Sequence, residues 1–591
     1  MLPSSFTPSG LFIGLRNLLR NDQMILGLLS VVVGLVGGGL VIALRESILF
    51  FQANFYGAPG ERLYDVAATL PWWQLLLVPT AGGLAVGLLV HYLMPNRRGQ
   101  GVADVIEASA LKGGKMSLTT GFYAALINAL SIGSGASVGR EGPAVHLGAS
   151  LAAWVSKQLH LSRSLARTIL GCGVAAAVAG SFNAPLAGAL FASEVVIGHY
   201  ALKAFAPVVI ASVTGTALSR SYYGDFPAFV LPPQQITSHY EFFAFIVLGV
   251  LAGLAASLLM RSVFFSQDQA QRLPVPAWVR PAIGGFLVGC IALVLPQVLG
   301  VGYGITDDAL SGSVGLWLLL AVLIGKIVAT GLSLGFGFGG GIFSPSLVVG
   351  AMLGAAFGLV VEIVFPGLSA GVTGYTLVGM GAVAAAVLGA PISTTLIIFE
   401  MTGDYEITTG VMLAVVVSTG ITRQISKNNF FALQLESRGL DLKGGFERAL
   451  LRANRVCDVM EETSEQVNPG IPLSQLRVML QDSKRGELFV VDQDGKLVGT
   501  ITLADLSETA FDPAMDLLIN AADVARRNPP VLACNDHLES ALSKMSDTGE
   551  AIIAVVDDLE NCKFLGAVEE KHVMAAYNRA LLQSRHEERD V

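Results

Sequence analysis

Long apolar segments separated by short polar connections follow one another from Met24 to about Thr422. A helix needs about 20 apolar residues to cross a bilayer, and several segments approach or exceed that length. Other segments, 181–189 and 335–345, are interrupted by glycine and proline. Irregular backbone at membrane depth is tolerated only where it lines protein or a watery cavity, so a transport path is expected there. The clearest apolar segments are Met24–Leu44, Leu75–Leu93, Phe242–Met260, Leu316–Leu334 and Gly410–Thr422.

An internal repeat divides this apolar part into two halves. Ala184-Pro185 is followed nine residues after the proline by Glu194, and Ala390-Pro391 is followed at the same interval by Glu400. Earlier in each half a proline precedes a glycine by five residues, at Pro143 and Gly148 and again at Pro345 and Gly350. Two halves with glycine- and proline-broken helix starts are typical of transporters built from repeats.

The pattern changes after about Arg438, where charged residues return and strands alternate with helices. Glu487–Val491 and Leu497–Ile501 are predicted to be two strands around a tight turn, preceded by an amphipathic helix over Leu473–Gln481. A second copy of this pattern is predicted, with a preceding helix over Leu538–Met545 and strands over Ala551–Val556 and Phe564–Val568. In both copies the pair of strands is expected to be followed by a further helix.

The expected domains follow from this change. Residues 1–438 form the membrane domain, with repeat halves of roughly 25–230 and 240–435. Residues 439–454 form a linker, and 455–591 form a soluble α/β pair of roughly 455–512 and 520–582.

Composition supports a membrane protein. The 591 residues are 53% hydrophobic and 14% charged, which is far from the balance of a soluble globular protein. The net charge of -8 arises mostly beyond residue 435 and describes the soluble tail. Five cysteines are scattered without metal-ligand spacing or a disulfide framework, and each is interpreted as a small buried apolar residue.

Gly139–Pro143 places Arg140 and Glu141 between two apolar segments. A charge at membrane depth costs roughly 3 kcal/mol or more, so such a residue is a candidate for function. The glycines and the early proline are typical of a helix start whose free N–H groups bind an anion. Because the Glu141 carboxylate is itself an anion, it can occupy that site in place of a dissolved anion. A site of this kind can act as a gate that is controlled by protonation of Glu141.

Three ordered motifs resemble those of the CLC family of chloride channels and proton/chloride exchangers. They are Gly139–Pro143, Phe182–Gly188 and Gly340–Pro345, and the tail resembles a pair of CBS modules. The resemblance implies an all-α polytopic CLC fold of two inverted repeats of tilted and broken helices, with a cytoplasmic α/β CBS pair. It also implies a homodimer with an anion path in each subunit and cytoplasmic termini, in an inner or plasma membrane.

The resemblance also assigns site residues. Amides near Arg140, Glu141 and Gly142 are expected to form the outer part of an anion site, and those around Gly341, Ile342 and Phe343 the central part. Glu141 resembles the gating glutamate of the family. It competes with chloride when ionised and swings out when protonated.

Two positions concern the proton. Exchangers of the best-known type carry a second glutamate near the inner surface, and Val195 stands at that position here. Valine carries no proton, and the neighbouring Glu194 is interpreted as a structural, hydrogen-bonded carboxylate.

Two polar donors of the family are also replaced. Gln100, within Gly99–Ala103, stands where a serine hydroxyl contacts chloride, whereas Ser134 is too close to Glu141 in sequence for that role. Phe431 falls at the position of the inner-gate tyrosine, with Phe430 as a competing assignment. The chloride site is therefore expected to bind more weakly.

In the tail, Gly499–Asp505 resembles the nucleotide-binding segment of CBS modules, with Asp505 on a ribose hydroxyl. His572 stands at the corresponding place in the second copy and lacks that acceptor. Adenine-nucleotide binding and a purely structural, dimerising module both stay open.

The leading interpretation is a passive, voltage- or proton-modulated chloride channel gated by Glu141. The alternative is a proton/chloride exchanger with an inner proton route that avoids Val195. Chloride, protons and the bilayer are the expected partners, with no cofactor, metal or nucleic acid and no enzymatic activity. The eight histidines form no catalytic or metal constellation, and the acids Glu141, Glu194 and Glu400 are too few for a cation transporter.

Overall fold

The computed structural model describes residues 22–58, 60–198, 202–224, 240–366, 371–440, 451, 454–462, 465–483, 485–506, 516 and 518–589. The chain divides into two compact units, residues 1–441 and 442–591. The expected linker, 439–454, lies mostly outside the described residues.

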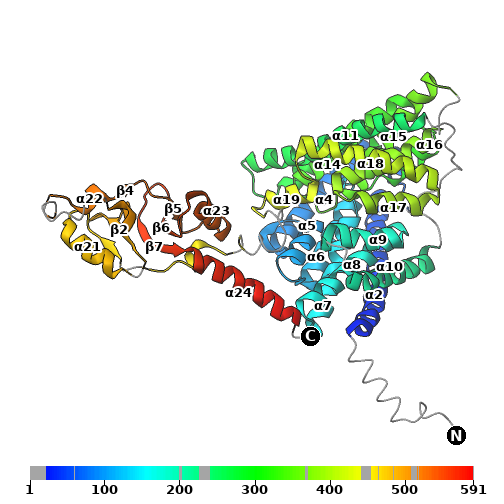
Figure 1. Cartoon of the computed structure of the whole chain (residues 1–591). Coiled ribbons are helices and arrows are strands. Elements are labelled where there is room, and N and C mark those ends of the chain that lie inside the picture. Colours follow the sequence, from blue (N-terminus) through cyan, green and yellow to red (C-terminus); the bar gives the residue numbers. More distant parts are fainter. Residues whose placement is uncertain are drawn as a thin grey trace, which may run out of the picture. The chain divides into compact units, whose positions relative to one another are not determined.

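The first unit is helical, and eight of its described helices are long and apolar enough to cross a membrane (Figure 1). Its helices are α2 (Asp22–Tyr56), α3 (Leu63–Ala67), α4 (Trp72–Leu93), α5 (Val102–Ala110), α6 (Leu118–Gly133), α7 (Glu141–Gln158), α8 (Arg163–Phe182), α9 (Pro185–Phe191), α10 (Leu202–Tyr223), α11 (Glu241–Arg272), α12 (Arg280–Ala292), α13 (Tyr303–Leu310), α14 (Leu316–Gly335), α15 (Phe343–Val364), α16 (Gly371–Leu388), α17 (Pro391–Thr402), α18 (Tyr405–Ser426) and α19 (Phe430–Glu436).

The predicted repeat is visible as corresponding helices, with α7 to α10 in the first half and α15 to α18 in the second. Its glycines allow matching helix crossings. A side chain on Gly148 would lie 2.4 Å from the Gly173 carbonyl oxygen, and one on Gly350 would lie 2.4 Å from that of Gly379. Close backbone approach through small residues is how helices associate in lipid.

The proline-broken segments start short helices in equivalent places. α8 ends at Phe182, Asn183 adopts a left-handed conformation with φ of 58°, and α9 begins at Pro185. In the second half α16 ends at Leu388, and α17 begins at Pro391. Proline suits the first turn of a helix because its missing N–H would have no partner there. α9 and α17 pack against each other.

The second unit contains two small α/β modules, as the tail pattern predicted. The first sheet has the order β1 (Gln466–Val467), β2 (Glu487–Val491), β3 (Leu497–Thr502) and β4 (Arg526–Arg527), with β1 parallel to β2 and the other pairs antiparallel. The second has β5 (Val531–Ala533) parallel to β6 (Ile552–Val556), which is antiparallel to β7 (Phe564–Glu569). The helices are α21 (Leu473–Asp482), α22 (Ala521–Val524), α23 (Leu538–Thr548) and α24 (Glu570–Arg589).

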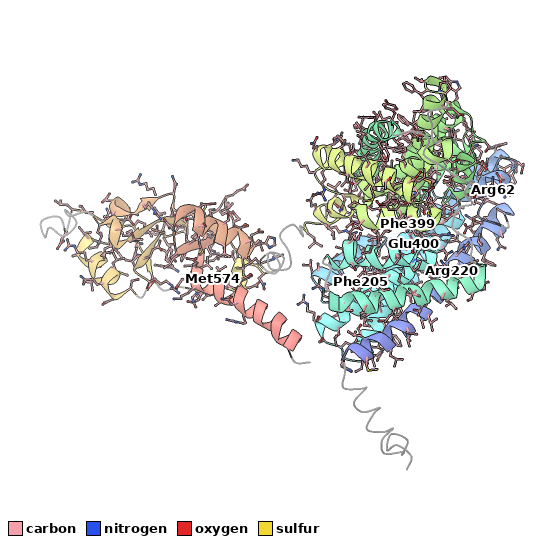
Figure 2. The ribbon with its side chains drawn as sticks, turned by 45° about the vertical axis from the view of Figure 1, so that its right-hand side comes forward. Arg62, Phe205, Arg220, Phe399, Glu400 and Met574 are labelled. Atoms are coloured by element: carbon pink, nitrogen blue, oxygen red, sulfur yellow. A yellow bond between two sulfur atoms is a disulfide. The ribbon has the colours of Figure 1, made fainter. Side chains whose placement is uncertain are left out.

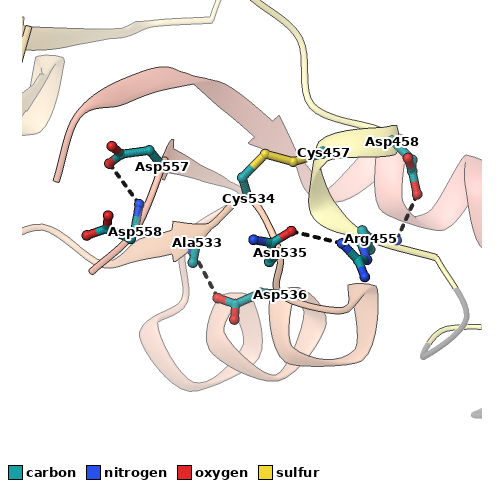
Figure 3. The surroundings of a disulfide bond; sticks show 9 residues. All are labelled: Arg455, Cys457, Asp458, Ala533, Cys534, Asn535, Asp536, Asp557 and Asp558. Carbon is teal, nitrogen blue, oxygen red and sulfur yellow. Dashed lines mark hydrogen bonds between the residues drawn. A yellow bond between two sulfur atoms is a disulfide. The ribbon is translucent and has the colours of Figure 1, made fainter. Parts of the chain in front are cut away.

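The prediction that the cysteines lack disulfide pairing is wrong for one pair. Cys457 and Cys534 form a disulfide with their Cα atoms 4.9 Å apart (Figure 3). The backbone around the bond is already paired, because the Val456 N–H donates to the Asp536 carbonyl at 2.9 Å. The Arg455 guanidinium also donates to Asn535, at 2.9 Å. The bond therefore attaches the start of the unit to its second module.

Candidate functional site

Two helix starts, one from each repeat, meet in the membrane unit. α7 begins at Glu141 and α15 at Phe343. The residues just before them are joined by two backbone hydrogen bonds, from Gly139 N–H to the Gly341 carbonyl at 2.7 Å and back at 2.8 Å. A side chain on Gly142 would lie 3.1 Å from the Gly341 Cα, so glycine permits this approach. Both helix N-termini therefore direct their partial positive charge to one region.

The Glu141 carboxylate lies buried in that region, with 1% of the residue exposed. Its Oε1 accepts a hydrogen bond from the Tyr303 hydroxyl at 2.8 Å. Its Oε2 accepts a hydrogen bond from the Ser344 hydroxyl. A buried carboxylate needs such partners, and here they are hydroxyl groups on α13 and α15.

Arg140 is directed mainly at a different acid. Its guanidinium forms an ion pair with Glu61, whereas its Nε lies 4.0 Å from Glu141 Oε1. Glu61 also accepts a hydrogen bond from Arg45 at 2.6 Å. The guanidinium carbon of Arg140 lies 4.9 Å from the centre of the Tyr303 ring, within range of a cation–π contact.

A cavity of about 390 Å³ brings most of the predicted anion-site residues together. These residues come from both repeats and from the connections before α5 and at the start of α19. Arg140, Glu194 and Val195 are not among its lining residues. The predicted residues that line it are Gln100, Glu141, Gly142, Gly341, Ile342, Phe343 and Phe431.

The charge of the cavity favours anions. The cavity is lined by Arg97, Arg98, Arg280 and Arg438, and among the described residues that line it Glu141 is the one acid. A cleft lined by one sign of charge raises the local concentration of the opposite ion. Asp104 does not line the cavity, but its carboxylate forms ion pairs with Arg98 at 2.7 Å and Arg438 at 3.1 Å. These ion pairs offset part of the positive charge of the cavity.

Phe430 and Phe431 both line this cavity, and both are buried. Their ring centres lie 5.9 Å apart, and Phe430 also contacts Phe264 at 5.7 Å. The choice between them as the constricting ring therefore stays a prediction. Ser134 caps the end of α6, where its hydroxyl donates to the Ser131 carbonyl at 3.0 Å, and it does not line the cavity.

Glu194 lies beyond α9 and is engaged by the first turn of α17. Its carboxylate accepts from Ile392 N–H at 3.1 Å, Ser393 N–H at 2.9 Å and the Ser393 hydroxyl at 2.7 Å. Glu400, labelled in Figure 2, lies near the end of α17. Its carboxylate accepts hydrogen bonds from the Leu186 N–H at 2.9 Å and the Ala187 N–H at 2.8 Å, both in α9. Val195 is half-buried and packs against the apolar core.

In the second unit the predicted nucleotide residue closes a local turn. Asp505 Oδ2 accepts hydrogen bonds from the Thr502 N–H at 2.8 Å and from its hydroxyl at 2.7 Å. His572, at the corresponding place in the second module, lies 3.5 Å from a carboxylate oxygen of Glu461. Asp505 therefore keeps its hydrogen bonds within its own module.

Sequence reasoning missed Tyr303, Glu61 and the role of Ser344 as a donor. Ser344 stands inside the quoted Gly340–Pro345 motif, so its closeness to the site could have been expected. Tyr303 lies 162 residues from Glu141, and Glu61 lies 79 residues from Arg140, outside every repeated motif. Their contacts depend on how the helices pack.

Comparison with known proteins places this geometry in a family. The family described as voltage gated chloride channel matches residues 82–423, and the CBS domain matches 456–511 and 521–579. The voltage-gated ClC-type chloride channel ClcB of Escherichia coli is 31% identical over 408 residues, 68% of this chain and 97% of that protein.

Two solved structures share the fold. A slow cyanobacterial Cl-/H+ antiporter has a TM-score of 0.64 at 22% identity, covering 70% of this chain and 97% of that one. A CLC-type fluoride/proton antiporter has a TM-score of 0.59 at 24% identity, covering 69% and 97%. With the helix starts, the cavity and the two CBS matches, the chain belongs to the CLC family of integral membrane chloride transport proteins and carries a C-terminal pair of CBS domains.

Proposed function

We propose that the chain is a passive chloride channel in which Glu141 is a protonatable gate. The observation that carries the proposal is the position of the Glu141 carboxylate, which lies where two helix N-termini meet and also lines the arginine-rich cavity. Helix N-termini attract an anion through partial charges and hold it without a full counter-ion, which suits an ion that must leave again.

Protonation changes the competition at this place. The ionised carboxylate occupies the region that favours negative charge and excludes chloride. The neutral acid loses that attraction, so a chloride ion entering from the cavity can displace it. Gln100 and Phe431 line the same cavity and are proposed as residues along the chloride path.

Val195 favours passive conduction because it cannot carry a proton at the position where exchangers of the best-known type have a glutamate. Both carboxylate oxygens of Glu194 accept hydrogen bonds from the start of α17, which supports a structural role for that residue. The second candidate is a proton/chloride exchanger, and the fold shared with two antiporters favours it. Chloride rather than fluoride is proposed as the substrate. The fluoride exporters of the family end the Gly139–Pro143 motif without a proline, whereas this chain has Pro143.

Further features of the family are proposed for this chain. The protein is proposed to be a homodimer with one chloride path per subunit. It is proposed to lie in an inner or plasma membrane, with the CBS pair on the cytoplasmic side. Arg97 and Arg98 in the connection after α4 support a cytoplasmic cavity mouth, because short basic connections favour that side.

Adenine-nucleotide binding at Asp505 is a further proposal, and it is tested by calorimetric titration of the protein with ATP. The absence of binding heat at millimolar ATP would contradict it.

Chloride efflux from proteoliposomes, with simultaneous external pH recording and valinomycin to set the potential, separates the two candidates. The proposal predicts chloride flux without accompanying protons. Protons driven uphill by a chloride gradient would establish an exchanger and mean that protons bypass Val195.

A further inference from the structure

A second, much smaller cavity lies beside Tyr303 and Arg140. Its volume is about 10 Å³, close to the least space that accommodates one water molecule. Its lining is unusually polar for the interior of a membrane unit. The lining residues are Arg45, Ile48, Leu49, Gln52, Glu61, Arg140, Val301 and Tyr303.

Gln52 indicates that this cavity is a water site. The residue is 3% exposed, and its Oε1 has no hydrogen-bond partner among the residues that the structure describes. Buried polar atoms are almost always hydrogen-bonded to protein or to ordered water. A water molecule in a cavity bounded by Gln52, Glu61 and Arg140 has enough polar partners to be stable there.

Tyr303 connects this cavity to the gate. It lines the small cavity, while its hydroxyl donates to Glu141 Oε1 at 2.8 Å. Glu141 in turn lines the large cavity. A tyrosine hydroxyl both donates and accepts hydrogen bonds, so it can pass a proton from one neighbour to another.

The small cavity is close to the protein surface on the side opposite Arg97 and Arg98. The side chains of Arg45 and Glu61 are 29% and 26% exposed. Glu61 lies in the connection between the candidate spans α2 and α4, whereas Arg97 and Arg98 follow the end of α4. Successive spans cross a bilayer in opposite directions, so these two connections face opposite sides.

We propose that Tyr303 relays protons to Glu141 from a water molecule in the small cavity. A proton from solution reaches that water near Glu61. The protonated water gives a proton to the Tyr303 oxygen, while the hydroxyl proton passes to Glu141 Oε1. Tyr303 and the water end as they began, and one solution proton now neutralises Glu141. The inference rests on the proposed gate function of Glu141.

Charged and titratable groups around the relay come from several elements. Arg45 on α2 and Arg140 before α7 are positive, and Glu61 is ion-paired with both of them. The buried Lys326 amine on α14 donates to the Val298 and Gly300 carbonyls at 3.1 and 2.8 Å. Tyr223 on α10 lies under Arg45, at 3.9 Å. Glu61 therefore offsets part of the positive field that would oppose an entering proton.

The test uses the full chain in proteoliposomes, with chloride flux followed by stopped flow after a step in external pH. Tyr303→Phe keeps the ring near Arg140 and removes the hydroxyl. Gln52→Leu removes the partner of the water without touching Glu141. Because positioned proton-transfer groups contribute about 10²–10⁴-fold, both variants are expected to slow the response at least roughly tenfold. Leu49→Val, in the same cavity, is the packing control and should respond at the wild-type rate.

Equilibrium and rate separate a relay from a structural role. Gln52→Leu should leave the midpoint of the pH titration of flux unchanged while slowing the response. A shifted midpoint at wild-type speed, or wild-type speed in both variants, would overturn the relay. Glu141→Gln tests the underlying function separately. If that variant loses its pH response while Tyr303→Phe and Gln52→Leu respond at full speed, the relay alone is wrong.

Discussion

Glu194 and Glu400 each cap the helix that begins in the other repeat. Glu194 accepts hydrogen bonds from the first turn of α17, and Glu400 accepts them from the first turn of α9. Carboxylates at helix N-termini satisfy free N–H groups and are favoured by the helix dipole. The reciprocal arrangement ties the two halves of the membrane unit together, with Glu400 at the end of α17 (Figure 2).

This symmetry predicts that Glu194 acts as a structural residue. Glu194→Gln and Glu400→Gln should each lower the free energy of unfolding of the detergent-solubilised protein by about 1 kcal/mol, as for the loss of a helix cap. This is measured as a similar fall in melting temperature for the two variants. Neither should change the pH dependence of chloride flux. A change in proton movement with Glu194→Gln alone would instead indicate that this carboxylate carries protons.

The close helix crossings of the repeat predict a strong effect of a single methyl group. In Gly350→Ala the new Cβ would lie 2.4 Å from the Gly379 carbonyl oxygen, so α15 and α16 must separate. Overpacking of this kind costs about 1–3 kcal/mol, which is measurable as a lower melting temperature. Gly420→Ala on α18 is the matched control, because nothing lies within 4 Å of its Cβ. Equal melting temperatures for the two variants would contradict this account of the packing.

The replaced donors predict weak chloride binding that can be strengthened. Gln100→Ser and Phe431→Tyr place hydroxyl groups at two positions lining the large cavity. A hydrogen bond to a charged group contributes about 1.5–3 kcal/mol, so each variant should tighten chloride binding roughly tenfold in calorimetric titration. Phe430→Tyr is the comparison that decides between the two rings. Tighter binding in that variant but not in Phe431→Tyr would move the inner gate to Phe430.

Glu487 gives the second unit a pH-dependent stability. Burial, and then the negative charge of Glu550, raise the pKa of Glu487 to about 7. Below pH 4.5, its ordinary pKa, folded and unfolded chains both hold the proton. Between pH 4.5 and about pH 7 the unfolded chain has released the Glu487 proton while the folded chain still holds it, so the free energy of unfolding falls as pH rises. Above pH 7 the free energy of unfolding is lower by about 3 kcal/mol.

Replacing this acid should therefore stabilise β2 and β3 at high pH. Amide hydrogen exchange of the full-length Glu487→Gln variant is compared with that of the wild type. The variant should protect the amides of residues 487–502 more strongly at pH 8 and about equally at pH 5. Equal amide protection in the variant and the wild type at pH 8 would mean that Glu487 ionises without cost in the folded protein.

Local patterns in the sequence were enough to predict the repeat, a helix start within each of the Gly139–Pro143 and Gly340–Pro345 motifs, and the strands of the second unit. They succeeded because prolines, glycines and apolar periodicity act over a few residues. The Tyr303–Glu141 hydrogen bond and the Arg140–Glu61 ion pair depend on packing between distant elements. Cys457 and Cys534, 77 residues apart, show no spacing that predicts pairing.

The most direct test of the gate is chloride efflux from proteoliposomes containing Glu141→Gln, measured from pH 4 to pH 8 beside the wild type. Glutamine is neutral at every pH and so resembles the protonated acid. The account predicts that wild-type flux rises as pH falls, whereas the variant conducts at a high and nearly constant rate. A variant that keeps the wild-type pH dependence would contradict the assignment of Glu141 as the gate.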